Sequence, residues 1–572
     1  MSSSAGENED AADATGQKRR AVRSKTSPKA KVAKVEEGKD VSPTPAGTED
    51  TSNPMQVEEG EKHHVGTEET STPMQKVESK STRTATSATD NYLTDLMKLA
   101  RCFSGKLGGA EKKAVQQTLV EISNQIGALQ VSSSCSGSEL QMLVGKSVAR
   151  VFGGASQMCD YQTVFSCEKE GFKQRWIKGV HEAMCELPAC CFKDMADIHG
   201  SSAPCAVHDG QCEVLGCKDG VLIHWAGFSC KTLSPLARSP ASKTALPQKE
   251  GTTGSTFDHL VKYLKTHQVP IYIGENVKEL LSSAVNVNYL KQTLASIGYC
   301  TMMRVLVSSN FKAPQHRQRT WIVALHLDLC KLTSGQGRGR LEAIFKTIDK
   351  MMDSDPMPLQ QFILPNDSFY LQEHYMAKCK NQMNQKDQSP DVKWKKQYKA
   401  MLAEQRIRVS NAYPPECIRA SPWYGILSER NRMVLGYEMH MDSSLTSVDV
   451  FQSMGRAMCG HNSQLGTVVP GSMVYVTTPE VNRLLCGLDY MQIQGLPRTF
   501  PTAKIMKKVD VSDGMLQDMA GNAFSSQVAM AVLIGVLVNF PEGLLTQMTA
   551  LMEARELPVP TTSEDVLDSM AL

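Results

Sequence analysis

The chain of 572 residues lacks several features that would point directly to a class of protein. No stretch approaches the roughly 18 uninterrupted apolar residues that a membrane helix needs. The nearest candidate, AMAVLIGVLVNF at 529–540, is too short, and we expect a buried core helix there. No signal-peptide pattern opens the chain, and its 17 cysteines follow no regular spacing. These absences favour reduced thiols in a cytosolic or nuclear protein.

A strong excess of one charge is also missing, because the net charge is only +2. Any contact with nucleic acid must therefore come from local patches rather than from the whole surface. One patch is the Lys/Arg cluster at 18–31. It is typical either of a segment for nuclear import or nucleic-acid contact, or of a solvated tail. We predict a nuclear protein on this basis.

Aromatic residues are nearly absent from residues 1–88, which are rich in Ser, Thr, Glu, Lys and Pro. Such a segment cannot bury enough apolar area to offset the entropy lost on ordering. We therefore predict a disordered tail over 1–88, followed by a helical lead-in over 89–127 with apolar residues at helical spacing.

From residue 128 to 330 short apolar runs alternate with helical stretches. This alternation predicts an α/β fold, with a Rossmann-like, doubly wound and mostly parallel sheet. Residues 331–480 break the pattern, because they are more polar and more basic and carry Lys and Arg around Trp394 and Tyr398. We predict a smaller domain there, a return to the first domain over 481–545, and a C-terminal tail over 546–572.

Unusual residues follow several of the predicted strands. In an open α/β sheet, ligands bind at the carboxyl ends of the strands. The residues at such ends are Cys135 to Glu139 (CSGSE), Glu168, Asp194, Cys230, and Glu275 to Val277 (ENV). The cysteine at 230 raises the question of whether it is one more buried thiol or a nucleophile held at a strand end.

Five motifs resemble, in order, those of the S-adenosylmethionine-dependent cytosine-C5 methyltransferases, over roughly residues 125–545. WAGFSCKTLS (225–234) resembles the GPPCQxFS nucleophile loop, and GENV (274–277) resembles the ENV motif. The other three are APQHRQRTWIVAL (313–325), DYMQIQGLPRTF (489–500) and MAGNAFSSQVAMAVLIGVL (519–537). Five motifs in order are far more specific than any one alone.

The chain departs from the family pattern at two motifs. Ser229 and Lys231 flank the cysteine in place of Pro and Gln, and CSGSE carries Cys135 where the family's first motif has Phe. A rival for the first motif, VFGG at 151–154, lies at the end of a helical face and leaves no helix before the next strand. We therefore assign the first motif to CSGSE.

The resemblance implies a DNA (cytosine-5-)-methyltransferase. Cys230 would add as a thiolate to carbon 6 of cytosine, which makes carbon 5 nucleophilic. Glu275 would hold or donate a proton at ring N3, and Asn276 would fix the loop. Arg317 and Arg319 would contact the nucleotide and the nucleophile loop.

The resemblance also implies S-adenosylmethionine as the cofactor. Its expected binding residues lie in the first turn, at two further strand ends and in the last motif: Ser136, Gly137, Glu139, Glu168, Asp194, Met195 and Asn522. Glu168 would accept hydrogen bonds from the ribose, Asp194 and Met195 would meet the adenine, and Asn522 would close the methionine side.

One further group of residues suggests a metal site: Cys190, Cys191, Cys205, His208, Cys212 and Cys217. It contains no CxxC pair and its spacings are irregular, so we predict no metal.

The predicted partner is double-stranded DNA with the target cytosine flipped out of the helix, recognised mainly by residues 331–480. Two alternatives remain open: a catalytically silent relative that binds DNA or regulates a partner, and a methyltransferase acting on RNA. No membrane association is expected, and the sequence specifies neither the target site, nor maintenance or de novo behaviour, nor the oligomeric state.

Overall fold

The structure is a computed structural model that describes residues 82–153, 159–186, 189–234, 243–353, 355–384, 392–408, 413–462 and 464–556. The basic cluster at 18–31 and nearly all of the predicted tail over 1–88 lie outside these residues. Everything below concerns the single compact unit that begins at Glu78.

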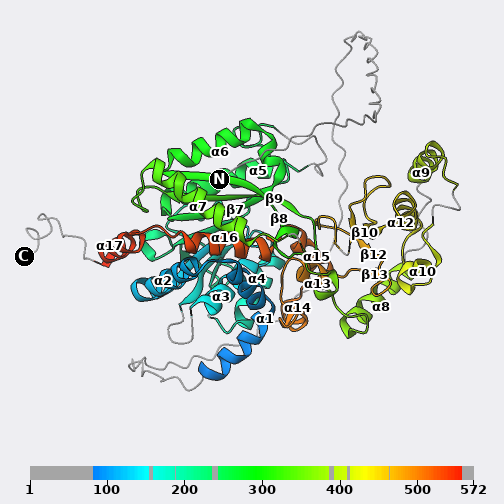
Figure 1. Ribbon diagram of the computed structural model, residues 1–572, viewed down its shortest axis with the longest axis horizontal. Helices are drawn as coiled ribbons and strands as arrows, with labels where there is room; N and C mark the ends of the chain where they lie inside the picture. Colours follow the sequence, from blue (N-terminus) through cyan, green and yellow to red (C-terminus); the bar gives the residue numbers. More distant parts are fainter. Residues whose placement is uncertain are drawn as a thin grey trace, which may run out of the picture. The chain divides into compact units, whose positions relative to one another are not determined.

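The strands and helices follow the predicted order closely (Figure 1). The strands are β1 (Ala128–Ser134), β2 (Asp160–Cys167), β3 (Cys190–Phe192), β4 (Ser202–Pro204), β5 (Gln211–Glu213), β6 (Ile223–Ala226), β7 (Ile271–Val277), β8 (Tyr299–Val307), β9 (Gln318–His326), β10 (Leu445–Asp449), β11 (Cys459–His461), β12 (Val474–Val476) and β13 (Arg483–Leu484). The helices are α1 (Thr82–Lys106), α2 (Gly109–Ile126), α3 (Leu140–Phe152), α4 (Gly171–Ala183), α5 (Gly251–His267), α6 (Ala284–Ser296), α7 (Ser334–Met351), α8 (Phe369–Asn384), α9 (Val392–Glu404), α10 (Glu416–Arg419), α11 (Pro422–Gly425), α12 (Glu429–Met441), α13 (Gly487–Ile493), α14 (Thr502–Val509), α15 (Asp513–Asn522), α16 (Ser526–Val538) and α17 (Leu544–Glu556).

The large sheet has seven strands in the order β3-β2-β1-β6-β7-β9-β8. β1 pairs in parallel with both β2 and β6, and β6 pairs in parallel with β7. β9 is antiparallel to both of its neighbours, so the sheet is mostly but not wholly parallel. The strand order reverses between β1 and β6, and the carboxyl ends of strands on either side of such a switch point form a crevice.

Both faces of this sheet are covered by helices, which confirms the predicted α/β class. Alternate residues of one strand enter different cores: in β9, Trp321 and Val323 face one core and Ile322 faces the other. α5 and α6 cover the second face, while α1 to α4, α7 and α16 pack on the first (Figure 1).

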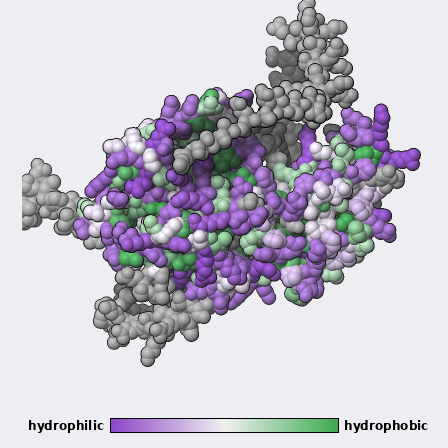
Figure 2. All heavy atoms as spheres, in the orientation of Figure 1, coloured by the Kyte–Doolittle hydropathy of each residue, from purple (hydrophilic) through white to green (hydrophobic). Residues whose placement is uncertain are grey.

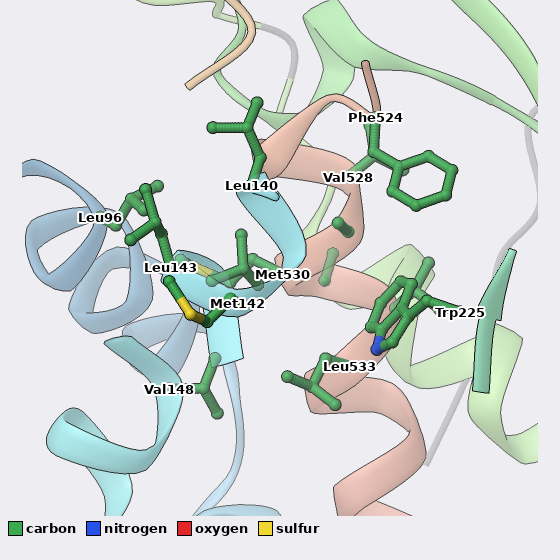
Figure 3. Packing of buried hydrophobic residues seen from close by; sticks show 14 of the residues in the cluster. Leu96, Leu140, Met142, Leu143, Val148, Trp225, Phe524, Val528, Met530 and Leu533 are labelled. Carbon is green, nitrogen blue, oxygen red and sulfur yellow. The ribbon is translucent and has the colours of Figure 1, made fainter. Parts of the chain in front are cut away.

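Helix α16 is the centre of the larger core. Its residues from Ser526 to Leu537 are all buried, as expected for the apolar run at 529–540. Figure 3 shows its Val528, Met530 and Leu533 beside residues of α3 and Trp225 of β6. Packing against two elements on opposite sides explains why this helix has no polar face.

The smaller domain contains an antiparallel sheet in the order β11-β10-β12-β13, with a core of its own formed with α9, α11 and α12. Its limits differ from the predicted 331–480. Helix α7 packs into the core of the large sheet through Leu341, Ile344 and Ile348, and the small sheet extends to Leu484. The predicted C-terminal tail of the chain, 546–572, begins inside helix α17.

Within the described residues no single helix has the length and apolar character needed to span a membrane; α15 and α16 meet the test only jointly, across a 41° bend. The face seen in Figure 2 is mostly hydrophilic, with hydrophobic residues in small groups.

Candidate active site

A cavity of about 250 Å³ lies at the switch point, where the chain leaves β1, β2, β6 and β7 at their carboxyl ends. Its wall includes eight of the eleven residues expected to act in catalysis or cofactor binding: Ser136, Gly137, Glu168, Cys230, Glu275, Arg317, Arg319 and Asn522. Segments from six separate parts of the sequence therefore meet in one place, and the parallel strands β1, β2, β6 and β7 bring four of them to one edge of the sheet.

The loop that carries Cys230 is held on both sides by hydrogen bonds. Asn276 Nδ2 donates to the Phe228 carbonyl at 2.8 Å, which ties the loop to the end of β7. On the other side the first turns of α5 accept from the loop backbone: Ser229 N donates to Thr256 Oγ1 at 3.0 Å, and Thr232 N to Thr253 Oγ1 at 2.9 Å. These bonds position the half-buried Cys230 at the cavity wall.

The two residues that flank Cys230 have different environments. The Ser229 hydroxyl lies 3.0 Å from Thr252 Oγ1, so both its side chain and its N–H are used. A proline at this position has no N–H and could not donate the bond to Thr256. The serine therefore allows helix α5 to hold the loop at this residue, where a proline would not. Lys231 is exposed and also lines the cavity.

Glu275 and the two arginines form one buried charged group. Arg319 Nε lies 3.1 Å from Glu275 Oε1, and Arg317 Nη2 lies 3.8 Å from the same oxygen. The register of β7 and β9 explains the closer pair: Val277 is opposite Arg319, so Glu275 is its diagonal neighbour on the same face. Within the described residues Glu275 Oε1 accepts no hydrogen bond and Arg317 Nε donates none.

Arg317 also joins the cavity to the loop at 465–470. Its guanidinium donates to the Val468 carbonyl at 2.8 Å and to the Ala523 carbonyl at 3.0 Å, and it contacts the Gly521 carbonyl. The side chain is only 3% exposed. Bonds to these three carbonyls make Arg317 a positioning residue for the end of α15, and its side chain also lines the cavity, where the resemblance predicts contact with the nucleotide.

The charges around Cys230 oppose one another. Burial raises the pKa of the Cys230 thiol above its ordinary value, the Glu275 carboxylate raises it further, and Arg319 and Arg317 lower it. Burial likewise raises the pKa of Glu275, against the effect of the two arginines. The thiol is therefore the stable form at neutral pH, and a nucleophile here needs its proton removed when the substrate binds.

The opposite wall of the cavity is built from the first turn and the end of β2. Gly137 has φ +50, and its N–H donates to Glu168 Oε2 at 3.0 Å. Glu168 Oε1 accepts from the N–H groups of Lys169 and Glu170 at the start of α4. Burial raises the pKa of Glu168, while Lys173 and the N–H groups of Glu170 and Gly137 oppose that rise.

Three expected cofactor residues do not line the cavity. Glu139 is fully buried beneath it, where its carboxylate accepts from Ser166 Oγ at 2.9 Å and lies 3.2 Å from His181 Nε2. The left-handed turn at Glu139 directs this side chain into the core, so a structural role replaces the expected binding role. Asp194 and Met195 follow β3 just outside the cavity, with Asp194 paired to Lys169 at 2.7 Å and Met195 against Cys135 at 3.4 Å.

One residue of the cavity wall, Lys173, was not expected from the sequence, and it lies close to the predicted Asn522. Lys173 lines the cavity from α4, with its ammonium 3.0 Å from Glu170 and 3.3 Å from Asp518. Asn522 is oriented by donating to the Asp518 carbonyl at 3.1 Å. A lysine one turn into a helix has no distinctive sequence signal, because only the fold brings α4 beside α15.

The cysteine and histidine residues for which we predicted no metal lie partly together in the structure. Four of its six members, Cys190, Cys205, His208 and Cys212, lie together with their ligand atoms within 4.8 Å of one another. Cys191 and Cys217 are buried elsewhere. A hairpin made of β4 and β5 folds the irregular spacing into one cluster.

The large sheet is a doubly wound α/β sheet, and its cavity lies at the carboxyl ends of the strands, where proteins of this class bind their ligands. The chain belongs to the family described as C-5 cytosine-specific DNA methylase, whose sequence model matches residues 225–535, more than half of the 572 residues. This confirms the resemblance drawn from the five motifs.

Curated relatives match over shorter segments. DNA (cytosine-5-)-methyltransferase DMT5 of Cryptococcus neoformans is 30% identical over 209 residues, 36% of this chain and 8% of that protein. Type II methyltransferase M.NgoBI of Neisseria gonorrhoeae is 32% identical over 100 residues, 17% of this chain and 29% of that protein. The matched segment thus covers less than a third of either relative.

Two solved structures are similar at low identity. A DNA modification methyltransferase encoded within an E. coli prophage covers 72% of this chain and 98% of its own, with 14% identity and a TM-score of 0.39. The S. pombe Dnmt2 methyltransferase covers 75% and 100%, with 11% identity and a TM-score of 0.37.

Proposed function

We propose that the protein transfers a methyl group from S-adenosylmethionine to carbon 5 of cytosine in DNA. The observation that carries this proposal is the single cavity that joins Cys230, Glu275 and the arginines to the turn at Ser136 and Gly137. A reaction between a pyrimidine and a methyl donor needs both binding walls within one enclosure.

The chain's own groups suit the pyrimidine. Cys230 forms a bond from sulfur to carbon 6, and Glu275 holds the proton at ring N3 as negative charge develops there. The Glu275 carboxylate lines the cavity and is held in place there by its ion pair with Arg319, which positions it for this contact. After carbon 5 has gained its methyl group, water takes the proton from carbon 5, the double bond between carbons 5 and 6 re-forms, and the sulfur leaves carbon 6 as the Cys230 thiolate.

The opposite wall fits the cofactor, which supplies an electrophilic methyl group when bound. The space between Gly137 and the Glu168 carboxylate is open, because the atom nearest to a Cβ at position 137 would be Glu168 Oε2, at 3.8 Å. Ser136, Gly137, Glu168 and Asn522 would hold it, with Asp194 and Met195 at the adjacent strand end.

Helix α9 of the smaller domain offers a surface for nucleic acid. Tyr398 and Leu402 are buried in the small core, while Lys396, Lys399 and Arg406 are exposed on and just after the helix. Exposed cations of this kind contact phosphates and position the duplex without reading its sequence. The basic cluster at 18–31 supports a nuclear location as part of the same proposal.

The test is covalent trapping. The purified chain is incubated with S-adenosylmethionine and duplex DNA containing 5-fluorocytosine, whose fluorine cannot be removed as a proton would be. We expect a stable protein–DNA adduct on denaturing gels that Cys230→Ala abolishes. Cys102→Ala is the matched control, because this exposed thiol lies on α1 outside the cavity.

Two other outcomes would replace the proposal. DNA binding without an adduct would favour the catalytically silent alternative. An adduct with 5-fluorocytosine in RNA but not in DNA would make RNA the substrate.

A further inference from the structure

We propose that Cys190, Cys205, His208 and Cys212 bind one Zn²⁺ ion, which fastens the β4–β5 hairpin to the edge strand β3 of the large sheet. The four residues lie outside the cavity described above, and the proposed methyl transfer uses none of them.

The distances around His208 carry this inference. Its Nδ1 lies 3.5 Å from Cys190 Sγ, 3.5 Å from Cys205 Sγ and 3.3 Å from Cys212 Sγ. A ring nitrogen has either one proton or one lone pair, so it cannot form three hydrogen bonds at once. Three sulfurs gathered at equal distance around one nitrogen therefore need another explanation.

A tetrahedral zinc ion provides that explanation. With Zn–S bonds of about 2.3 Å and a Zn–N bond of about 2.0 Å, each nitrogen-to-sulfur edge of the tetrahedron is about 3.5 Å long. The three observed distances match that edge. Three thiolates and one imidazole form a ligand set typical of structural zinc, and four protein ligands leave no position open for a substrate.

The local backbone is folded to present these ligands. Cys190 opens β3, Cys205 directly follows β4, and Cys212 lies in β5. The turn between β4 and β5 carries His208 and then Asp209 with φ +49. The Val207 N–H points at Cys205 Sγ at 3.4 Å, a contact that stabilises a thiolate ligand.

The cluster lies where the short hairpin meets the edge strand of the large sheet. The hairpin has only three residues in each strand, and it contacts β3 through the Phe192–Cys205 bridge and the bond from Ala206 N to the Cys191 carbonyl at 2.7 Å. A two-stranded hairpin of this size is marginal by itself. A shared ion would hold it to the sheet.

The test counts metal in the full chain, expressed with zinc and purified under reducing conditions. We expect one zinc per chain by elemental mass spectrometry, and loss of that zinc in Cys205→Ser and Cys212→Ser. His208→Cys should keep one zinc, because four thiolates also form a tetrahedral site. Cys102→Ser, the exposed control on α1, should keep it as well.

A second measurement does not depend on variants. Removing the metal from the unaltered chain with a chelator should lower its melting temperature, and Zn²⁺ should restore it. Co²⁺ added to the metal-free chain should give the thiolate charge-transfer absorption of a tetrahedral sulfur site.

A chain without zinc whose reduced form binds no Co²⁺ would overturn the proposal. So would a zinc content that the Cys205 and Cys212 substitutions leave unchanged. Neither the zinc content nor the binding of Co²⁺ depends on methyl transfer, so failure of the proposed function would not affect these two measurements.

Discussion

The Cys230 sulfur lies under the influence of one carboxylate and two guanidinium groups, and their balance sets its reactivity. The motif predicted a nucleophile flanked by unusual neighbours, but it did not say which charges act on it. The structure assigns that influence to Glu275, Arg319 and Arg317, which come from β7 and the start of β9.

Glu275→Gln should lower the pKa of the Cys230 thiol, because it removes the carboxylate that helps to raise it. A fall of one in pKa gives about a tenfold rise in thiolate at a fixed pH below the pKa. The measurement is the rate of Cys230 alkylation against pH, followed by peptide mass spectrometry. The midpoint of that profile should move to lower pH.

The same substitution should nevertheless abolish adduct formation, since the proton at ring N3 loses its partner. Glu279→Gln, just beyond the end of β7 and outside the cavity, should change neither quantity. An alkylation midpoint that stays fixed in Glu275→Gln would contradict the assigned charge balance.

At the scale of elements, helix α15 and the loop at 468–470 meet through a very close backbone contact. A Cβ on Gly521 would lie 2.1 Å from Pro470 N and 2.4 Å from the Val469 carbonyl carbon. Arg317 donates to carbonyls on both sides of this contact. The loop between β11 and β12 of the small domain and the cavity wall thus form one close-packed junction.

Gly521→Ala should destabilise the protein by about 1–3 kcal/mol, because the methyl group meets backbone that cannot yield. The melting temperature should fall, and cofactor binding by calorimetry should weaken as Asn522 is displaced. Gly514→Ala, in the first turn of the same helix, meets only Ser512 Oγ at 3.9 Å. That control should be neutral or slightly stabilising, since alanine favours a helix.

A melting temperature equal to that of the unaltered chain in Gly521→Ala would show that the junction is flexible. The prediction separates packing from helix propensity, because both substitutions are glycine to alanine in α15.

At the scale of the whole molecule, one buried group should dominate the change of stability between pH 6.5 and 9. His181 lies 3.2 Å from Glu139 Oε1 and 3.2 Å from Glu186 Oε2 beneath the cavity. Burial alone lowers the pKa of His181, but the hydrogen bonds to these carboxylates outweigh it and raise the pKa to about 9.

Because the folded pKa lies above the ordinary 6.5, the protonated histidine stabilises the folded state fully below pH 6.5. This contribution, about 3 kcal/mol, is lost as the pH rises through 9. Urea unfolding at pH 6 and pH 9.5 should show that loss. His181→Gln should remove the pH dependence in this window, while His199→Gln, at an exposed position, should retain it.

The sequence predicted the fold more fully than the site. The periodicity of apolar residues predicted alternating strands and helices between 128 and 330, because this periodicity is a local property of the chain; it did not predict α4, β4 or β5. The five motifs then placed Cys230, Glu275, Arg317, Arg319 and Asn522, and the strand-end pattern placed Glu168; all six line one cavity in the structure.

Only the tertiary structure decided which of these side chains face the cavity. The turn after β1 sends Glu139 into the core toward His181, although the same turn leaves Ser136 and Gly137 at the wall. The reversal of strand order at β1 and β6 makes the crevice itself, and no short stretch of sequence encodes that reversal. The sequence analysis named Cys190, Cys205, His208 and Cys212 but rejected them for their irregular spacing. Spacing along the chain does not reveal a residue brought in by a neighbouring strand, and the contact of β3 with the hairpin brings Cys190 to the other three.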